Sequence, residues 1–213
     1  MAVYLSNLLI RLKFYVYKVA RDVGFAPNPF GGYCTLATCK PKIRRNANVD
    51  DWVFGIGSKK SGNDGRIVYG LLITETLTYN EYWNDFRFQF KKPVLNGSLK
   101  SIKGDNIYYK GNEGWFQANS HHSNLDGTTN YVNLKKDTSA DRVLISEHFY
   151  YFGSNSIPIP EDIFDEVYIK FQGEKLIKNS VASAKLVDYI KQYPKNQLIG
   201  LPTSFYSTDK FKG

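Results

Sequence analysis

The feature that most constrains the fold is a pair of strand-like runs joined by a polar loop. Residues 51–57 (DWVFGIG) and 67–76 (IVYGLLITET) are rich in aromatic and β-branched residues, which favour strands. The loop between them, residues 58–66 (SKKSGNDGR), is polar and contains glycine, which is typical of a turn region. We therefore predict a β-hairpin with a long basic loop.

Other strand patterns are short, and helical patterns are few. We predict further strands at residues 13–19, 35–39, 142–146 and 148–152. Thr78, with Glu81 three residues later, predicts the capped start of a short helix, and residues 182–191 have the apolar spacing of an amphipathic helix. Because the connections lack full βαβ helices, most strand pairs should be antiparallel. The expected fold is α+β, a small, mostly antiparallel barrel with short peripheral helices.

The segment from residue 86 to residue 141 is rich in Gly, Asn, Ser and Lys and shows little periodicity. So long an irregular insert favours a functional role over a simple connection. Residues 1–12 are apolar but lack the cationic start and the cleavage site of a signal peptide, so we interpret them as an N-terminal extension. We predict a single globular domain over residues 13–213.

A net charge of +8 and an aromatic content of 15% are the two unusual bulk properties. A basic surface attracts polyanions through their phosphates, and aromatic faces stack on bases. A β-rich core that uses Tyr and Phe explains the same composition without nucleic acid, so composition alone leaves both interpretations open. No apolar run reaches the roughly 18 residues of a membrane span, so we expect no membrane partner.

The chain has two cysteines, Cys34 and Cys39. If they share a strand, their Cα atoms are about 16 Å apart, whereas a disulfide tolerates about 7 Å. A reducing cytoplasm is therefore the expected location. Two cysteines also make a poor zinc site, and no metal is expected. The sequence has no P-loop and no dinucleotide-binding glycine motif, and we expect no cofactor.

Histidines and carboxylates in predicted loops and strand edges are the candidates for catalysis. His121 or His122 could protonate a leaving base or activate water. Asp105 and Asp141 could activate water or stabilise a cationic sugar-like transition state. The alternatives are surface or capping histidines, and an Asp141 that pairs with Arg142 or caps a turn.

Loop aromatics and a basic run are the candidates for binding nucleic acid. Asn28 lies between two prolines, and its amide could read a base edge. Alternate aromatics within strands must be core, so loop aromatics are the better candidates for stacking. The predicted base-binding residues are Asn28, Phe25, Phe30, Tyr33 and Trp115. The predicted phosphate contacts, which solvated loops would explain equally well, are Lys40, Lys42, Arg44, Arg45, Lys59 and Lys60.

Several blocks of the sequence resemble the second nucleotide-modification-associated domain family. The blocks are ARDVGFAPNPFGGYCTLATCKPKIRR, DDWVFGIGSKKSG with IVYGLLITETLTYNEYWND, KGDNIYY, NSHHS and TSADRVLISEHFYYFG. The resemblance covers roughly residues 13–171. Domains of this family occur in bacteria and phages near genes for DNA modification and anti-phage conflict. The central hairpin is also similar to that of PUA-like barrels, including the EVE, YTH and ASCH groups, which hold an extruded base in an aromatic pocket.

The resemblance implies a protein that flips a modified base out of DNA into an aromatic pocket. In one hypothesis the protein is an enzyme with an anti-phage role. It cleaves the glycosidic bond of the modified base, as a DNA glycosylase does, or otherwise hydrolyses the base. In the alternative it is a reader, and a partner nuclease or modification enzyme acts. A DNA-binding protein without a base pocket is a third class. The acid–base groups in the loops and the absence of a fused effector favour the enzyme.

Overall fold

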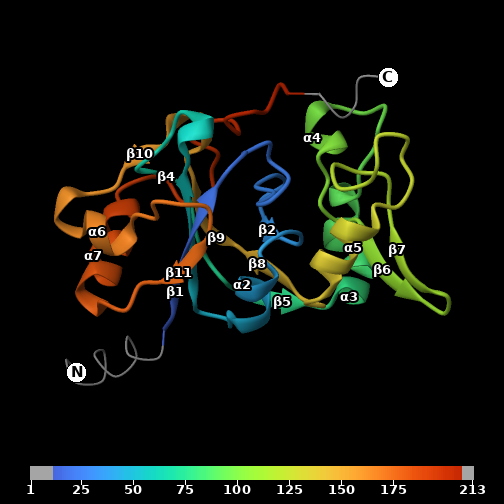
Figure 1. Ribbon diagram of the computed structural model, residues 1–213, viewed down its shortest axis with the longest axis horizontal. Helices are drawn as coiled ribbons and strands as arrows, with labels where there is room; N and C mark the ends of the chain where they lie inside the picture. The colour runs from blue at the N-terminus through green and yellow to red at the C-terminus, as the bar shows by residue number, and fades with distance from the viewer. Residues whose placement is uncertain (1–11, 208–213) are drawn as a thin grey trace. The chain divides into compact units, whose positions relative to one another are not determined.

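The computed structural model describes residues 12–207, which form two compact units (Figure 1). The first unit contains residues 12–21, 47–74 and 147–203, and the second contains residues 22–46, 75–146 and 204–207. Of the predicted N-terminal extension, residues 1–11 lie outside the described residues. This division into two compact units does not test the prediction of a single domain over residues 13–213, which stays a prediction.

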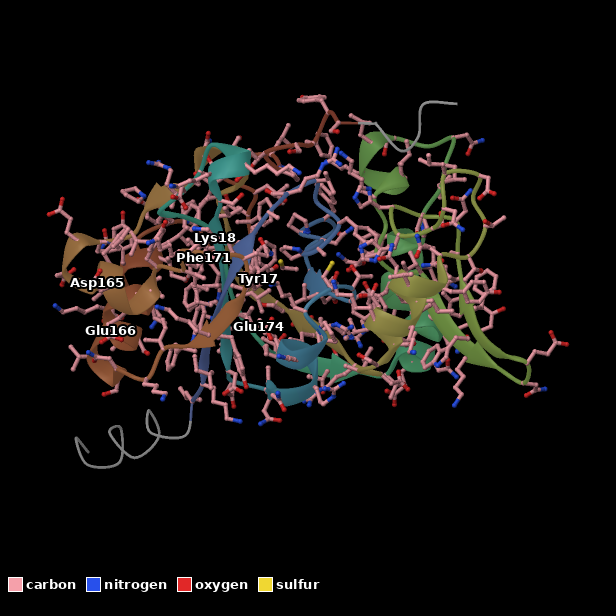
Figure 2. The ribbon with its side chains drawn as sticks, in the orientation of Figure 1. Tyr17, Lys18, Asp165, Glu166, Phe171 and Glu174 are labelled. Atoms are coloured by element: carbon pink, nitrogen blue, oxygen red, sulfur yellow. The ribbon has the colours of Figure 1, made fainter. Side chains whose placement is uncertain are left out.

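A six-stranded sheet forms the first unit. Its path runs β10–β4–β3–β1–β11, and β9 also pairs with β4. The strands are β1 (Phe14–Val19), β3 (Trp52–Gly57), β4 (Arg66–Leu72), β9 (His148–Tyr151), β10 (Ile157–Pro158) and β11 (Glu174–Leu176). Strands β3 and β4 pair antiparallel, which confirms the predicted hairpin, whereas β1 and β3 are parallel. At the β1–β11 edge, Tyr17 is in register with Glu174 (Figure 2).

Helix α7 (Ser180–Ile190) packs against this sheet (Figure 1). Leu186, Val187 and Ile190 of the helix belong to the same buried apolar cluster as alternate residues of β1 and β3, including Phe14 and Phe54. Because alternate strand residues share a face, this cluster defines the covered face. The other short elements of the unit are η1 (Lys59–Ser61), η3 (Gly153–Asn155), η4 (Glu161–Ile163) and α6 (Phe164–Val167).

The second unit combines a small antiparallel sheet, a hairpin and several short helices. The sheet order is β2–β8–β5, and β6 pairs with β7 in the separate hairpin. The strands are β2 (Cys34–Leu36), β5 (Glu75–Leu77), β6 (Tyr108–Gly111), β7 (Gly114–Gln117) and β8 (Val143–Ser146). The helices are α2 (Pro41–Asn46), α3 (Tyr79–Asn84), η2 (Phe86–Lys91), α4 (Leu99–Ile102) and α5 (Tyr131–Thr138). An aromatic-rich core that includes Phe25, Tyr82 and Phe88 joins these elements.

The protein is an α+β protein with mostly antiparallel pairing, as its sequence predicts. The predicted small PUA-like barrel is not observed, because none of the sheets formed by residues 12–207 closes on itself. Strands β8 and β9 follow one another in the chain, yet β8 belongs to the sheet of the second unit and β9 to that of the first. This change of sheet at Glu147 divides the strands between two open sheets.

Local sequence signals explain several element boundaries. The capping box of α3 forms as predicted. The Thr78 side chain accepts a hydrogen bond from the Glu81 backbone amide, and the Glu81 side chain accepts one from the Thr78 backbone amide. The basic run KPKIRR is not a loop: it folds into α2, with Pro41 at the first helical position, where proline is favoured. The insert at residues 86–141 contains η2, α4, the β6–β7 hairpin and α5. No helix within residues 12–207 has the length and apolar character that a membrane crossing requires.

Candidate active site

The turn between β2 and α2 holds Cys39 in a strained backbone conformation. Its φ is 59°, and Lys40 follows with a φ of 41°. Left-handed backbone costs a non-glycine residue roughly 1–2 kcal/mol, and Pro41 disfavours the right-handed helical region for the residue before it. The Cys39 amide donates to Asp137 Oδ1 over 2.8 Å, and Arg44 Nε donates to the Cys39 carbonyl over 2.8 Å. A strand–turn–helix with a strained, partly exposed residue resembles the way other enzymes present a nucleophile.

His122 lies next to the Cys39 sulfur. The distance from Cys39 Sγ to His122 Nε2 is 3.6 Å. The loop that carries the histidine is fixed through its backbone, since the His122 carbonyl accepts from Gln117 Nε2 and from Asn133 Nδ2. Phe25 packs on the imidazole with a ring-centroid distance of 4.8 Å. The side chain is 15% exposed, so the ring is oriented by its surroundings and still open on one side.

Asp137 of α5 completes a linear arrangement. His122 Nδ1 lies 2.7 Å from Asp137 Oδ2, and the Tyr108 hydroxyl donates to the same oxygen over 2.9 Å. The Cys39 amide donates to Asp137 Oδ1, so both oxygens of the carboxylate accept hydrogen bonds. A carboxylate on one ring nitrogen fixes the tautomer and leaves the other nitrogen for the nucleophile. A thiol, an imidazole and a carboxylate, the groups that cysteine enzymes use as nucleophile, base and orienting group, thus lie next to one another.

The electrostatics favour a charged imidazole and a charged carboxylate. Burial opposes the imidazolium of His122, but hydrogen bonds to Asp137 and Cys39 outweigh it and raise the pKa of His122 to about 9. Burial also opposes the carboxylate of Asp137, yet the hydrogen bond from His122 and the positive charges of His122 and Arg44 lower the pKa of Asp137 below its ordinary value. An imidazolium beside a cysteine is the setting in which cysteine enzymes stabilise a reactive thiolate.

The same three side chains could also be considered as metal ligands, since one donor atom from each lies within 4.8 Å of the others. The hydrogen-bond geometry argues against that use. The two imidazole nitrogens point in different directions, Nε2 toward Cys39 and Nδ1 toward Asp137. The Asp137 oxygens also already accept from a tyrosine and a backbone amide. The arrangement therefore fits a proton relay better than a chelate.

The stability that His122 contributes should depend on pH. Its pKa is raised from 6.5 to about 9, so the contribution is complete below about pH 6.5 and is lost as the pH rises through about 9. This shift corresponds to at most about 3 kcal/mol. We expect the free energy of unfolding of the wild type to exceed that of a His122→Asn variant by much more at pH 7 than at pH 10, measured by urea denaturation.

A His148→Asn variant is the control for this experiment. Burial lowers the pKa of His148, so this residue stays neutral over the same pH interval. Its effect on unfolding should be equal at pH 7 and pH 10. An equal effect of the His122 substitution at both pH values would contradict the ion pair with Asp137.

Comparisons with known proteins address the family. The family model described as nucleotide modification associated domain 2 matches residues 11–209. The chain belongs to this family. The match covers both compact units, and it confirms the resemblance seen in the sequence blocks. Neither the curated proteins nor the solved structures gave a match.

Within this family member, the predicted catalytic residues lie in different environments. His122 is the one that contacts both Cys39 and Asp137, whereas the ring of His121 packs against Phe25 at 5.2 Å. Asp105 is completely buried and accepts from Thr35 Oγ1 at 2.6 Å and from the Tyr82 hydroxyl at 2.8 Å. Burial raises the pKa of Asp105 to about 6. Asp141 is exposed and accepts from the Tyr79 amide at the start of α3.

The predicted base-binding residues separate into two groups. Phe25 belongs to the core beneath His122, Tyr33 packs edge-on against Phe88, and Trp115 packs edge-on against Tyr79. Asn28 and Phe30 instead line a cavity of about 240 Å³. The structure therefore brings two of the five together at a cavity.

The predicted phosphate contacts also separate. Lys59 and Lys60 are exposed in η1 of the first unit, whereas the KPKIRR residues belong to the second. Lys42 and Arg45 are exposed on α2, and Lys40 is half-buried. Arg44 is 0% exposed, and its guanidinium donates to four backbone carbonyls, those of Cys39, Asp137, Ala140 and Arg142. Arg44 therefore holds together the turn that carries Cys39.

Outward-facing aromatics lie on the β6–β7 hairpin, drawn in Figure 1. Tyr109 and Phe116 are cross-strand partners, with stacked rings whose centroids are 4.7 Å apart. Trp83 of α3 packs against both, and Lys92 Nζ lies 3.9 Å from the centre of the Trp83 ring. Phe116 is 43% exposed. We call Trp83, Tyr109 and Phe116 the aromatic cluster.

Sequence reasoning missed Cys39 and Asp137. The cysteines were considered as a disulfide or zinc ligands, and Asp137 lies in a segment interpreted as irregular. A signal for Cys39 was present: a lone cysteine between a strand and a Lys-Pro helix start, in a chain with histidines elsewhere, is a candidate nucleophile. Asp137 had no comparable local signal, because it is 98 residues from Cys39 along the chain.

Proposed function

We propose that the protein is an enzyme in which Cys39 attacks an amide or ester carbonyl carried by a modified nucleobase in DNA. The observation that carries the proposal is the linear arrangement of Cys39, His122 and Asp137, in which Cys39 lies on a strained turn. Membership of the nucleotide modification associated domain 2 family supports a modified nucleotide as the substrate.

The reaction proceeds in two steps. The Cys39 thiolate attacks the carbonyl carbon, and the C–N or C–O bond to the leaving group breaks as His122 Nε2 donates its proton to that group. The product of this step is a thioester on Cys39. In the second step His122 removes a proton from water, the hydroxide attacks the thioester carbon, and the thiolate leaves. The net change is hydrolysis of one acyl bond, and Asp137 holds the imidazole in orientation throughout.

A thiol route suits this site better than cleavage of a glycosidic bond. Glycosidic cleavage uses carboxylates beside a cationic sugar. Asp105 is buried beneath Thr35 and Tyr82, and Asp141 accepts from the amide that begins α3. These contacts favour structural roles for both carboxylates, which leaves Cys39 as the better nucleophile.

DNA as the carrier of the base is part of the proposal. The net charge of +8 favours a polyanion. The aromatic cluster offers one exposed ring, that of Phe116, beside two half-buried rings, and bases of a single strand can stack on such a surface. A base inside a duplex is out of reach of a side chain, so the modified base is flipped before it reacts. A role in conflict with phages follows as a prediction from the occurrence of the family.

Mass spectrometry of nucleosides tests the proposal. The purified protein is incubated with DNA that carries N-acylated or ester-bearing bases and with unmodified DNA, and the digested nucleosides are analysed. We expect a mass change equal to hydrolysis of the acyl bond, no abasic sites, and undiminished activity in the presence of a metal chelator.

Two other results would change the conclusion. Abasic sites with free modified base would indicate a glycosylase, and tight binding of modified DNA without any product would indicate a reader.

A further inference from the structure

The 240 Å³ cavity of the second unit is separate from the three side chains of the proposed relay. It is lined by residues of two segments, 28–31 and 90–104, and neither Cys39 nor His122 belongs to its lining. Pockets that hold drug-sized ligands span roughly 300–1,000 Å³, so this cavity fits a ligand no larger than one nucleotide unit.

The lining combines cations with phenyl rings. Lys91 is 1% exposed, and its Nζ donates to Asn28 O, Asn28 Oδ1 and Tyr33 O at 2.7–3.1 Å. Lys100 is exposed, with its Nζ 5.8 Å from the centre of the Phe30 ring. No Asp or Glu occurs among the residues that line the cavity. The charge of Lys91 interacts with buried Asp105, which lies outside the lining. The exposed charge of Lys100 at the cavity favours an anionic ligand.

Glycine at position 31 lets the Phe90 ring lie directly against the backbone in one wall of the cavity. Gly31 has a φ of +75°, and a Cβ atom there would lie 2.1 Å from the Phe90 ring. Phe90 is 50% exposed and belongs to the cavity lining, so a flat ligand can stack on its ring. Ser98 and Ser101 place hydroxyl groups at the same cavity, 2.9 Å from each other.

We propose that this cavity binds one nucleotide unit, with its base against Phe30 and Phe90 and its phosphate beside Lys100 and the hydroxyls of Ser98 and Ser101. The inference deepens the proposed function and takes its nucleotide substrate from it. The chain itself links the two sites: Phe25 packs on His122, Asn28 and Phe30 line the cavity, and Cys39 lies a few residues further on. The segment from residue 25 to residue 39 therefore contributes residues to both sites.

Binding of small probes to the full chain tests this. Deoxynucleoside monophosphates, the matching nucleosides, inorganic phosphate and a short single-stranded oligonucleotide are titrated at low salt by isothermal calorimetry. We expect Lys100→Gln to weaken the binding of monophosphates about tenfold, because one charged contact to phosphate is lost, and to leave the binding of nucleosides unchanged. Phe90→Ala should weaken the binding of both monophosphates and nucleosides. Comparison of monophosphate with oligonucleotide separates a free nucleotide from one within a strand.

A matched control and the opposing outcomes complete the experiment. Lys110→Gln removes an exposed lysine of β6 that is not part of the cavity lining, and it should leave the affinities for monophosphates and nucleosides unchanged. Monophosphate binding that is insensitive to Lys100→Gln and Phe90→Ala, or inorganic phosphate binding as tightly as the monophosphates, would overturn the inference. Cavity binding as expected with no acyl hydrolysis would instead refute the proposed function and leave the cavity assignment standing.

Discussion

Replacement of Cys39 by serine is expected to reduce turnover at least about 10³-fold while leaving the fold and the binding of modified DNA intact. The serine hydroxyl is a weaker nucleophile than the thiolate beside His122, so acylation fails although the site keeps its shape. Turnover is measured by the nucleoside assay, and the acyl-enzyme is sought by mass spectrometry of the intact protein. We expect an adduct on the wild type and none on Cys39→Ser.

The second cysteine provides a matched control. Cys34 is fully buried in β2, and burial raises the pKa of its thiol far above the ordinary value. Iodoacetamide should therefore alkylate Cys39 and leave Cys34 unmodified in the folded protein. Cys34→Ala should retain activity. Full activity in the Cys39→Ser variant would exclude the thiol mechanism.

Replacement of Arg44 by methionine is expected to destabilise the protein by at least about 3 kcal/mol. The guanidinium is completely buried and donates to four backbone carbonyls of the second unit, over 2.6–2.8 Å. Methionine fills part of the volume but donates no hydrogen bond, so all four carbonyls lose the guanidinium. The carbonyls of Asp137 and Ala140 keep other donors, the Tyr79 hydroxyl and the Arg142 amide. Each buried group that is left unsatisfied costs about 1–3 kcal/mol. Chemical denaturation measures the loss.

The neighbouring Arg45 is the control for this substitution. It is exposed on the same helix and donates to a single carbonyl, that of Ser139. Arg45→Met should change the free energy of unfolding by less than about 1 kcal/mol. Similar small effects at both positions would show that the Arg44 contacts do not hold the turn. If Arg45→Met weakens DNA binding without changing stability, Arg45 has the phosphate-binding role predicted for the KPKIRR run, and this role is distinct from the structural role of Arg44.

The two aromatic neighbours Trp115 and Phe116 show where sequence reasoning stops. Both lie in β7, and the alternation of a strand requires that they face opposite sides. Nothing local says which side meets the core, and Trp115 was the one predicted to stack on a base. In the structure Trp115 packs against Tyr79 and Phe116 points outward. The core beneath the hairpin, made by distant residues, decides the orientation.

Arg44 illustrates the same point for charge. A run with four cations in six residues has the composition of a phosphate-binding loop, and it folds into α2 with one arginine turned inward. Burial of an arginine is tolerated only where acceptors surround it. Three of its acceptors belong to the segment from Asp137 to Arg142, more than 90 residues away. No local pattern carries that information.

The sequence by itself determined the β3–β4 hairpin, the capped start of α3, the α7 helix, the α+β class and the family. Each of these depends on periodicity, caps or motif blocks, which are properties of contiguous residues. Only the tertiary structure decided that the strands remain in open sheets and that Cys39, His122 and Asp137 meet. Cys39 and His122 are 83 residues apart, and their contact depends on how the turn, the loop and α5 pack around a shared core. Packing of distant segments is a property of the whole fold, so this candidate site was out of reach of local sequence patterns.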